Sequence, residues 1–249
     1  WVATFFYGRY RIGQPTEEGT TAIALIGRNE PVEYEQDQER ELQLFDAYVR
    51  ESIRVIETSD DPVDAVAWPE SMLTGTMPWS LGEGGSESAL ANGLSVEEEL
   101  AMIAEYQQRY QFRSNNLQTM LAKSNGPQSL RPEILGGCGV VDYGTITRVY
   151  SGIVQIGNDG QVRDWYGKTH LVMFGEYIPL VRHLPVIRNW VPANLGLTVG
   201  EGAKRLYVGE TILCPNICIE TAVERVPINH LRQLRNDSVG TMPDVILTV

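Results

Sequence analysis

The sequence predicts an α/β protein with a buried β-sheet. Residues 20–27 and 64–68 are short apolar runs of the kind that forms buried strands. Between them, residues 37–57 carry apolar side chains at helical spacing. A strand, a helix and a strand in this order predict a βαβ-like unit, whose sheet is covered by helices. With 249 residues, 43% of them hydrophobic, the chain can form a sizeable core.

The middle of the chain adds a long helix and further strands. Residues 75–95 are rich in glycine, serine and glutamate and predict a mobile loop. The segment Ser95 to Glu98 is a capping box, which predicts a helix that runs to about Lys123. Strands are expected at residues 134–141, 148–156 and 162–166, and a turn signal at 158–160 (Asn-Asp-Gly) joins the last two.

The last part of the chain predicts a second hairpin, a helix and a strand. Residues 205–208 and 211–217 alternate as a hairpin, and the helix that follows reaches about Arg235. Thr221 or Glu220 can serve the start of that helix. Residues 244–249 predict a last buried strand, and because the sequence stops there, we expect the fold to be C-terminally incomplete.

Composition narrows the classes of function. A net charge of −12 argues against a nucleic-acid-binding protein, which would need a basic face. No run approaches the ~18 apolar residues that a membrane span needs, and the apolar start of the chain is too short for a signal peptide. Cys138, Cys214 and Cys218 are an odd number without metal-ligand spacing. At least one thiol is therefore expected to be free, and we expect neither a metal nor another cofactor.

Three residues with reactive side chains follow predicted strands. Glu70 comes directly after the strand at 64–68, Lys168 follows the strand at 162–166, and Cys218 lies at a strand-to-helix turn. Chemistry tends to occur at the carboxyl ends of strands in α/β sheets. Each residue also has an ordinary interpretation, as a charge in a first helical turn, a surface lysine that reaches water, and a small buried apolar side chain, respectively.

Together these three residue types suffice for acyl transfer. A thiolate can attack a carbonyl carbon, a carboxylate can take and return the proton, and a fixed cation can stabilise the oxyanion. The helix start at Cys218 is expected to lower the pKa of its thiol and to supply N–H donors to the oxyanion. The three histidines show no motif for a Cys–His pair.

Three segments resemble, in order, the motif blocks of the nitrilase (carbon–nitrogen hydrolase) superfamily. They are Trp68 to Glu70 (WPE), Tyr166 to Leu171 (YGKTHL) and Ile217 to Glu220 (ICIE), and the resemblance covers roughly residues 19–249. The resemblance implies a four-layer α-β-β-α sandwich, which fits the predicted order of strands and helices.

The resemblance also implies roles for the residues in these blocks. Glu70 would be the general base and acid, Lys168 would stabilise the oxyanion, and Cys218 would be the nucleophile. The backbone N–H of Ile219 would be a further oxyanion donor.

One branch of the superfamily, the apolipoprotein N-acyltransferases, is the most similar. The segment His170 to Pro179 (HLVMFGEYIP) resembles that branch's HLVPFGEYxP block, and Trp68 to Ser71 is close to its WPET. The aromatic-rich segment Trp1 to Tyr10 fits either an edge segment or a membrane-interface anchor. Tyr7 to Arg9 is similar to the branch's segment between its last membrane helix and its extracytoplasmic domain, which favours the anchor. On this resemblance, residues 1–18 are a linker after a missing membrane helix.

The branch implies a ping-pong reaction at the bacterial inner membrane, with this domain on the periplasmic side. An acyl chain passes from a phospholipid to Cys218 as a thioester, and then to the α-amino group of the diacylglyceryl-cysteine of an apolipoprotein. The implied partners are therefore the phospholipid donor, the lipoprotein acceptor and the membrane. Glu176 and Glu220 match glutamates of the branch that are thought to support the active site.

The sequence also departs from the pattern of the branch. Met173 stands where proline is usual, and Ile219 stands where a tyrosine usually follows the nucleophile. The long separation of Glu70 and Lys168 indicates an insertion within about 77–132. The membrane helices and a segment after the last strand are absent, so we expect this chain to be a domain of a larger membrane protein.

Two other functions remain open. The first is a soluble nitrilase-type amidase, which would use water as the acceptor, and the FGEY block argues against it. The second is an inactive binding module on the same fold, against which the complete set of Glu70, Lys168 and Cys218 argues.

Overall fold

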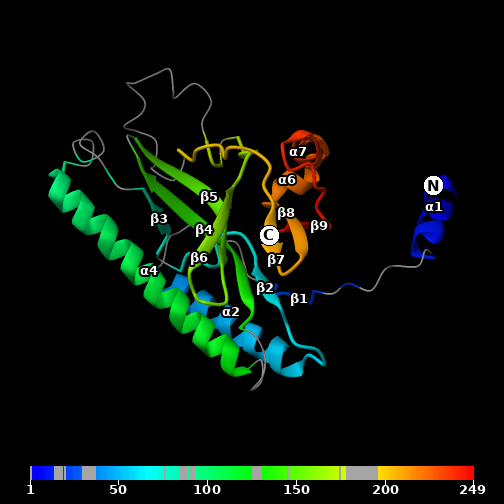
Figure 1. Ribbon diagram of the computed structural model, residues 1–249, viewed down its shortest axis with the longest axis horizontal. Helices are drawn as coiled ribbons and strands as arrows, with labels where there is room; N and C mark the ends of the chain where they lie inside the picture. Colours follow the sequence, from blue (N-terminus) through cyan, green and yellow to red (C-terminus); the bar gives the residue numbers. More distant parts are fainter. Residues whose placement is uncertain are drawn as a thin grey trace.

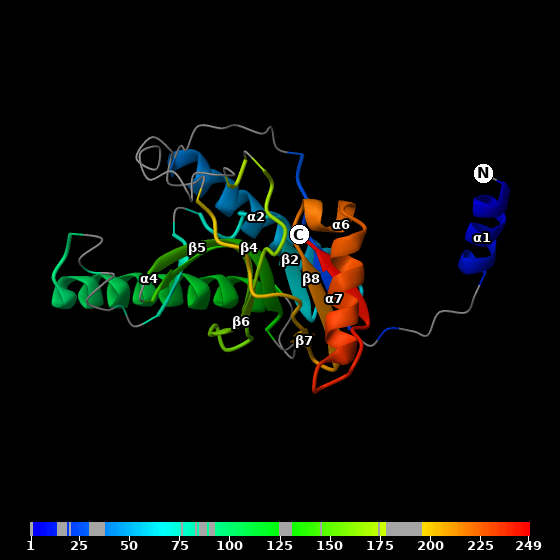
Figure 2. The ribbon, with the colours of Figure 1, turned by 90° about the horizontal axis from the view of Figure 1, so that it is seen from above.

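The computed structural model describes residues 2–13, 19, 21–29, 38–75, 77–82, 84, 89, 93–124, 131–144, 146–173, 175–177 and 196–249. Its helices and sheets confirm the predicted α/β class. Two sheets pack face to face, and helices cover the outer face of each, so the layers follow the predicted order α-β-β-α (Figure 1 and Figure 2).

The first sheet has six strands, in which β1, β2, β4, β5 and β6 are neighbours in that order and β3 also pairs with β4. Their bounds are β1 (Ile23–Leu25), β2 (Ala65–Trp68), β3 (Trp79–Leu81), β4 (Glu133–Tyr143), β5 (Thr147–Ile156) and β6 (Val162–Gly167). β1, β2 and β4 are parallel, whereas β4, β5 and β6 form an antiparallel meander. β2 pairs with the first part of β4 and β3 with its last part, so the turn after β2 lies against the middle of β4.

Helices α2 (Gln38–Thr58) and α4 (Val96–Ser124) cover one face of this sheet (Figure 1). Trp68 is fully buried beneath them, with the rings of Phe45 and Tyr48 5.4 and 5.6 Å away. The predicted capping box begins α4: the Ser95 amide donates to Glu98 Oε2 at 2.8 Å, and the Glu98 amide donates to Ser95 Oγ at 3.2 Å. Two reciprocal bonds of this kind satisfy amides that a helix start otherwise leaves unpaired.

The second sheet consists of β7 (Leu206–Val208), β8 (Thr211–Asn216) and β9 (Val245–Thr248). Its inner face meets the first sheet in an apolar core, and helices α6 (Ile219–Ala222) and α7 (Arg225–Asn236) lie on its outer side (Figure 2). The residues of this inter-sheet core are Ala65, Ala67, Leu135, Ile153, Tyr166, Leu206, Val208, Leu213, Ile217 and Leu247. The two sheets are therefore held together by the burial of apolar side chains between them.

Two details of the predicted elements were wrong. Residues 79–81, expected within a loop, form β3, a strand too short to show an alternating pattern. The single helix expected up to Arg235 is two helices, because Pro227 cannot bond to the carbonyl of Val223 and its ring would clash there. Val223 is accordingly extended, with φ −91° and ψ 90°.

The last strand also differs from the prediction. β9 was expected to be buried, but Val245 and Ile246 are exposed and only Leu247 lies in the core. β9 is the edge strand of the second sheet, so one of its sides has no neighbouring strand among the described residues.

The predicted linker at residues 1–18 contains a helix, α1 (Val2–Ile12), which lies apart from the sandwich (Figure 1 and Figure 2). Its aromatic side chains Phe5, Phe6, Tyr7 and Tyr10 are all more than 60% exposed. Within the described ranges, none of the helices combines the length and the hydropathy required to span a bilayer.

Candidate active site

Glu70 lies in a tight turn that rests directly on β4. The Leu73 amide donates to the Gly137 carbonyl at 2.8 Å, and the Met72 amide closes the turn on the Pro69 carbonyl at 3.3 Å. A Cβ atom on Gly137 would lie 2.3 Å from the Pro69 oxygen and 2.4 Å from the Glu70 Cα. The absence of a side chain at Gly137 therefore lets the backbone of Glu70 approach the strand.

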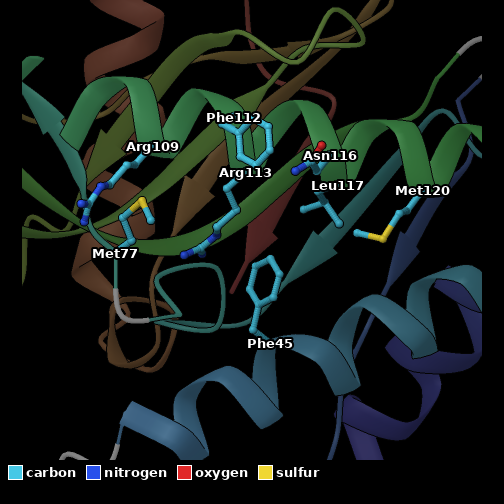
Figure 3. Close-up of a pocket in the computed structure, with 8 residues that line it drawn as sticks. All are labelled: Phe45, Met77, Arg109, Phe112, Arg113, Asn116, Leu117 and Met120. Carbon is cyan, nitrogen blue, oxygen red and sulfur yellow. The ribbon is translucent and has the colours of Figure 1, made fainter. Parts of the chain in front are cut away.

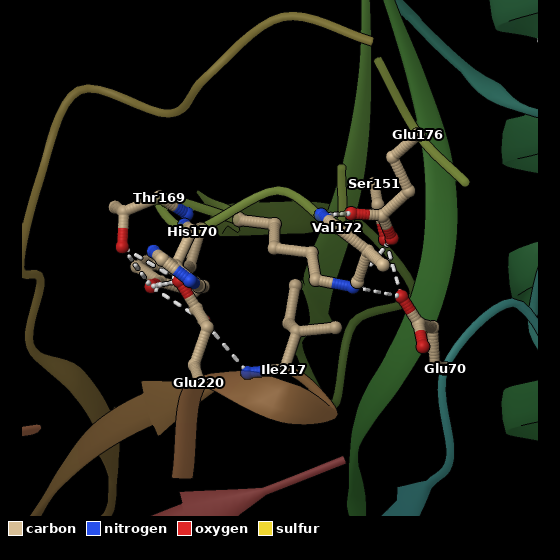
Figure 4. Close-up of polar contacts among 10 residues, drawn as sticks. Glu70, Ser151, Thr169, His170, Val172, Glu176, Ile217 and Glu220 are labelled. Carbon is tan, nitrogen blue, oxygen red and sulfur yellow. Dashed lines mark hydrogen bonds and ion pairs between the residues drawn. The ribbon is translucent and has the colours of Figure 1, made fainter. Parts of the chain in front are cut away.

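Lys168 follows the end of β6 and is only 1% exposed. Its amide donates to the Ser151 carbonyl at 2.9 Å, which fixes the backbone against β5. Its ammonium donates to Glu70 Oε1 at 2.9 Å and to Glu176 Oε1 at 2.5 Å. Figure 4 shows the carboxylate groups of Glu70 and Glu176 close to each other. The ordinary interpretation of Lys168 as a surface lysine was wrong.

Two carboxylates compensate for the burial of Lys168. Burial acts to lower the pKa of Lys168, but the hydrogen bonds and charges of Glu176 and Glu70 outweigh it, so the pKa is raised. The carboxylates are themselves held in place: Ser151 Oγ donates to Glu70 Oε1 at 3.1 Å, and the Val172 amide donates to Glu176 Oε2 at 2.8 Å. The cluster thus holds one cation and two anions in fixed positions.

Cys218 occupies a sharp turn between β8 and α6. Its backbone has φ 51° and ψ −115°, an uncommon conformation for a residue other than glycine. The Cys218 amide donates to the Val249 carbonyl at 2.8 Å, and the residue is exposed, whereas Cys138 and Cys214 are buried free thiols. This turn places Cys218 at an exposed position at the end of the strand.

The expected lowering of the Cys218 pKa was wrong. Burial raises the pKa of the thiol, and the charge of Glu70 and a hydrogen bond to it raise the pKa further. Lys168 and the Ile219 N–H lower the pKa, but these effects are smaller. Because α6 has only four residues, its dipole is too short to offset the neighbouring carboxylate.

Glu220 is fully buried and accepts hydrogen bonds from two different segments. From the segment that follows Lys168, the Thr169 amide donates to the carboxylate at 2.7 Å, the Thr169 hydroxyl at 2.6 Å and the His170 amide at 3.0 Å. From the turn before Cys218, the Ile217 amide donates at 2.8 Å. Figure 4 shows Thr169, His170 and Ile217 around this carboxylate. Glu220 thereby ties the Lys168 segment to the Cys218 turn.

Three members of this site were not predicted as site residues from the sequence. Ser151 lies in the middle of β5, and a serine in a strand does not by itself indicate a function. The Tyr166 hydroxyl donates to Glu220 at 2.9 Å, and burial followed by the charge of Glu220 raises the pKa of Tyr166 far above its ordinary value. His230 lies 3.0 Å from the Thr169 hydroxyl, and its inward position in the pattern of α7 was the available hint.

An apolar hollow of about 300 Å³ lies between α2 and α4 (Figure 3). Its lining is Phe45, Met77, Arg109, Phe112, Arg113, Asn116, Leu117 and Met120. Arg113 connects this hollow to the turn after Glu70, because its guanidinium donates to the Gly75 carbonyl at 2.9 Å and to the Leu73 carbonyl. Across the described residues, no cluster of three or more histidine, cysteine or acidic side chains could hold a metal ion.

Comparison with known proteins supports the resemblance seen in the sequence. The chain is 40% identical over 256 aligned positions to a protein named apolipoprotein N-acyltransferase from Rhodopirellula baltica. The alignment spans 100% of this chain and 45% of that protein, so the chain corresponds to less than half of its relative. No protein-family model matches the chain.

Solved structures show a more distant likeness. An amidase from Nesterenkonia sp. has a TM-score of 0.48 at 13% identity, with 95% of this chain and 66% of the amidase covered. A glutamine-dependent NAD+ synthetase from Acinetobacter baumannii has a TM-score of 0.44 at 12% identity, with 83% of this chain and 29% of the synthetase covered.

Proposed function

Because this chain is a homologue, along its whole length, of a protein named apolipoprotein N-acyltransferase, we propose that it is the catalytic domain of an enzyme of that kind. Its reaction would move an acyl chain from a phospholipid to the amine of a diacylglyceryl-cysteine at the start of an apolipoprotein. It would act at the bacterial inner membrane, with this domain on the periplasmic side. Two observations support the proposal: the buried Lys168 is held between Glu70 and Glu176, and Cys218 is an exposed free thiol at the end of a strand.

The first half of the reaction would form a thioester. Cys218 Sγ attacks the ester carbonyl of the phospholipid while Glu70 takes the thiol proton. The raised pKa of Cys218 favours this order, because the thiol holds its proton until a substrate is bound. The Lys168 ammonium and the Ile219 N–H would stabilise the tetrahedral oxyanion. When the oxyanion collapses, the ester C–O bond breaks and Glu70 gives its proton to the departing lysophospholipid alkoxide.

The second half would transfer the acyl chain to the amine. The neutral amine of the acceptor attacks the thioester carbonyl and passes a proton to Glu70. Collapse of the second oxyanion breaks the C–S bond, and the released Cys218 thiolate recovers its proton from Glu70. Glu176 would hold Lys168 in place throughout, and Glu220 would keep the Lys168 segment against the Cys218 turn.

The test is the intact mass of the protein after incubation with phosphatidylethanolamine in detergent, with and without hydroxylamine. The expected result is a gain of one acyl chain that hydroxylamine removes. Cys218→Ala should abolish the gain, whereas the matched variants Cys138→Ala and Cys214→Ala should keep it. An adduct that persists in Cys218→Ala would contradict the proposal. Ammonia release from small amides without any acyl adduct would instead indicate an amidase.

A further inference from the structure

His230 is the outermost member of the buried network behind Lys168 and Cys218. It lies on α7, is 4% exposed, and its Nε2 is 3.0 Å from the Thr169 hydroxyl. Its ring also stands edge-on to Tyr166, with centroids 6.0 Å apart and an angle of 80° between the planes. Neither contact follows from the proposed reaction, so the buried imidazole needs a reason of its own.

The hydrogen bonds assign the protons of this network. The Thr169 hydroxyl has one hydrogen, and its 2.6 Å bond to the Glu220 carboxylate, which can only accept, takes that hydrogen. The hydroxyl oxygen must therefore accept from His230, so Nε2 carries the imidazole proton. Among the described residues, the buried His230 Nδ1 has no hydrogen-bond partner, which fits a nitrogen that carries no proton. Burial also lowers the pKa of His230, although Glu220 acts in the opposite direction, so the ring is neutral at pH 7.

We propose that His230 is a positioning residue that fixes the Thr169 hydroxyl and, through it, the relation between Lys168 and Cys218. Thr169 directly follows Lys168. The Glu220 carboxylate accepts a hydrogen bond from the Thr169 hydroxyl and another from the amide of Ile217, the residue before Cys218. A Thr169 side chain free to rotate would release one of the donors that Glu220 shares between the two segments. The inference rests on the proposed function, because it assigns His230 a part in holding that reaction's groups.

A packing role alone makes a different prediction. If His230 only fills space beside Tyr166, an apolar side chain of similar size should replace it without loss. If its N–H is required, only a side chain that can donate at the same distance should replace it. Methionine and glutamine separate these cases, since both are unbranched, suit a helix, and differ mainly in the terminal N–H.

The experiment compares His230→Met with His230→Gln in the single-turnover rate of acyl-adduct formation from phosphatidylethanolamine. We expect His230→Met to lose about 10- to 100-fold, the usual cost of small misplacements in an active site, and His230→Gln to stay within about threefold. Equal rates in the two variants would overturn the proposal, whether both are slow or both are unchanged. If His230→Met does not fold, Thr169→Val and Thr169→Ser replace the pair, and only the valine should lose the rate.

A double-mutant cycle of His230 and Thr169 tests whether the two residues act together, which a packing role of His230 alone does not require. In the Thr169→Val background no hydroxyl remains for His230 to hold, so adding His230→Met should cost nothing further. Losses that multiply would show that His230 acts independently of Thr169 and would overturn the proposal.

A second readout does not depend on the proposed reaction. Iodoacetamide should alkylate the exposed Cys218 well before the buried Cys138 and Cys214, and the pH dependence of that rate reports the local electrostatics of the thiol. With Lys168 less firmly held, the profile of His230→Met should move to higher pH, whereas that of His230→Gln should match the wild type. If the wild type forms no acyl adduct, the proposed function fails while this comparison still decides the role of His230. Coincident pH profiles of His230→Met and His230→Gln would overturn the proposed role of His230.

Discussion

At the scale of single residues, the position of Glu70 depends on a close approach between its turn and β4. The turn that carries Glu70 lies so near β4 that only glycine fits at position 137. Two residues along the same strand and on the same side, Gly139 has ordinary space, since an added Cβ would lie 3.5 Å from Pro78. The two glycines therefore form a natural pair for testing whether the position of Glu70 limits the reaction.

Gly137→Ala should displace the Glu70 turn, because the added methyl group meets backbone atoms that cannot rotate away. We expect adduct formation to fall by about 100-fold and the free energy of unfolding to drop by about 1–3 kcal/mol. Single-turnover mass spectrometry and urea unfolding would measure the two effects. Gly139→Ala is the control and should change neither quantity appreciably. A Gly137→Ala protein with normal activity would show that this close approach does not position Glu70.

The charges around Cys218 predict opposite changes in two kinds of reactivity. Glu70 raises the pKa of the Cys218 thiol, so Glu70→Gln should lower that pKa and increase the rate of iodoacetamide alkylation at neutral pH. The same variant lacks the proposed proton acceptor, so its acyl transfer should fall by about 10²- to 10⁴-fold. Lys168→Met should reduce both rates, because the Lys168 charge lowers the thiol pKa. Slower alkylation of Glu70→Gln than of the wild type would contradict this electrostatic account.

At the scale of elements, α4 supports the site from a distance. It lies within the insertion predicted for 77–132, yet its Arg113 binds two carbonyls in the turn after Glu70. The guanidinium also stacks over Phe45 of α2, with its carbon 4.3 Å from the ring centroid. One side chain thus connects both covering helices to the turn that carries Glu70.

Arg113→Met should leave the Leu73 and Gly75 carbonyls without their donor. Each unsatisfied buried acceptor costs about 1–3 kcal/mol, so we expect the two to lower the free energy of unfolding by roughly 2–6 kcal/mol and to slow adduct formation. Arg109 lies one turn earlier on α4, is exposed and forms a surface ion pair with Glu105, so Arg109→Met should stay within about 0.5 kcal/mol of the wild type. Urea unfolding of both variants decides the matter, and equal stabilities would rule out this role of Arg113.

The elements also show how far the sequence could predict the structure. The helix at 37–57 and the capping box at Ser95 were confirmed, because periodicity and capping are local signals. The strand β3 and the exposure of β9 were missed, because pairing partners decide both. The break near Val223 was predictable in principle from Pro227, which the apolar pattern of the surrounding residues concealed.

The candidate site divides in the same way. Glu70, Lys168 and Cys218 could be selected because each follows a predicted strand within a recognisable motif, and their roles stay predictions. Ser151 and His230 could not be selected in this way. Ser151 contacts Glu70, which is 81 residues away in the sequence, and His230 contacts Thr169, which is 61 residues away. Contacts of such long range are products of the fold and leave no local pattern.

At the scale of the whole molecule, the site is assembled across the interface between the two sheets. Glu70 and Lys168 follow strands of the first sheet, whereas Cys218 follows β8 of the second. The inter-sheet core therefore sets the distance between Cys218 and the other two side chains. The core between the first sheet and its covering helices stabilises the protein without lying between the reactive groups.

Two leucines, both fully buried, allow this division to be tested. Leu213 lies in the inter-sheet core five residues before Cys218, and Leu121 of α4 lies in the core beneath the helices. Leu213→Ala and Leu121→Ala should each cost about 2–5 kcal/mol of unfolding free energy, because each leaves a cavity in a packed core. Only Leu213→Ala lets the second sheet settle toward the first, which would move Cys218 relative to Lys168.

Under conditions where both variants stay folded, we expect adduct formation to fall by about tenfold or more in Leu213→Ala and to change little in Leu121→Ala. Equal losses at equal stability would mean that the reaction follows overall stability and does not depend on the spacing of the sheets.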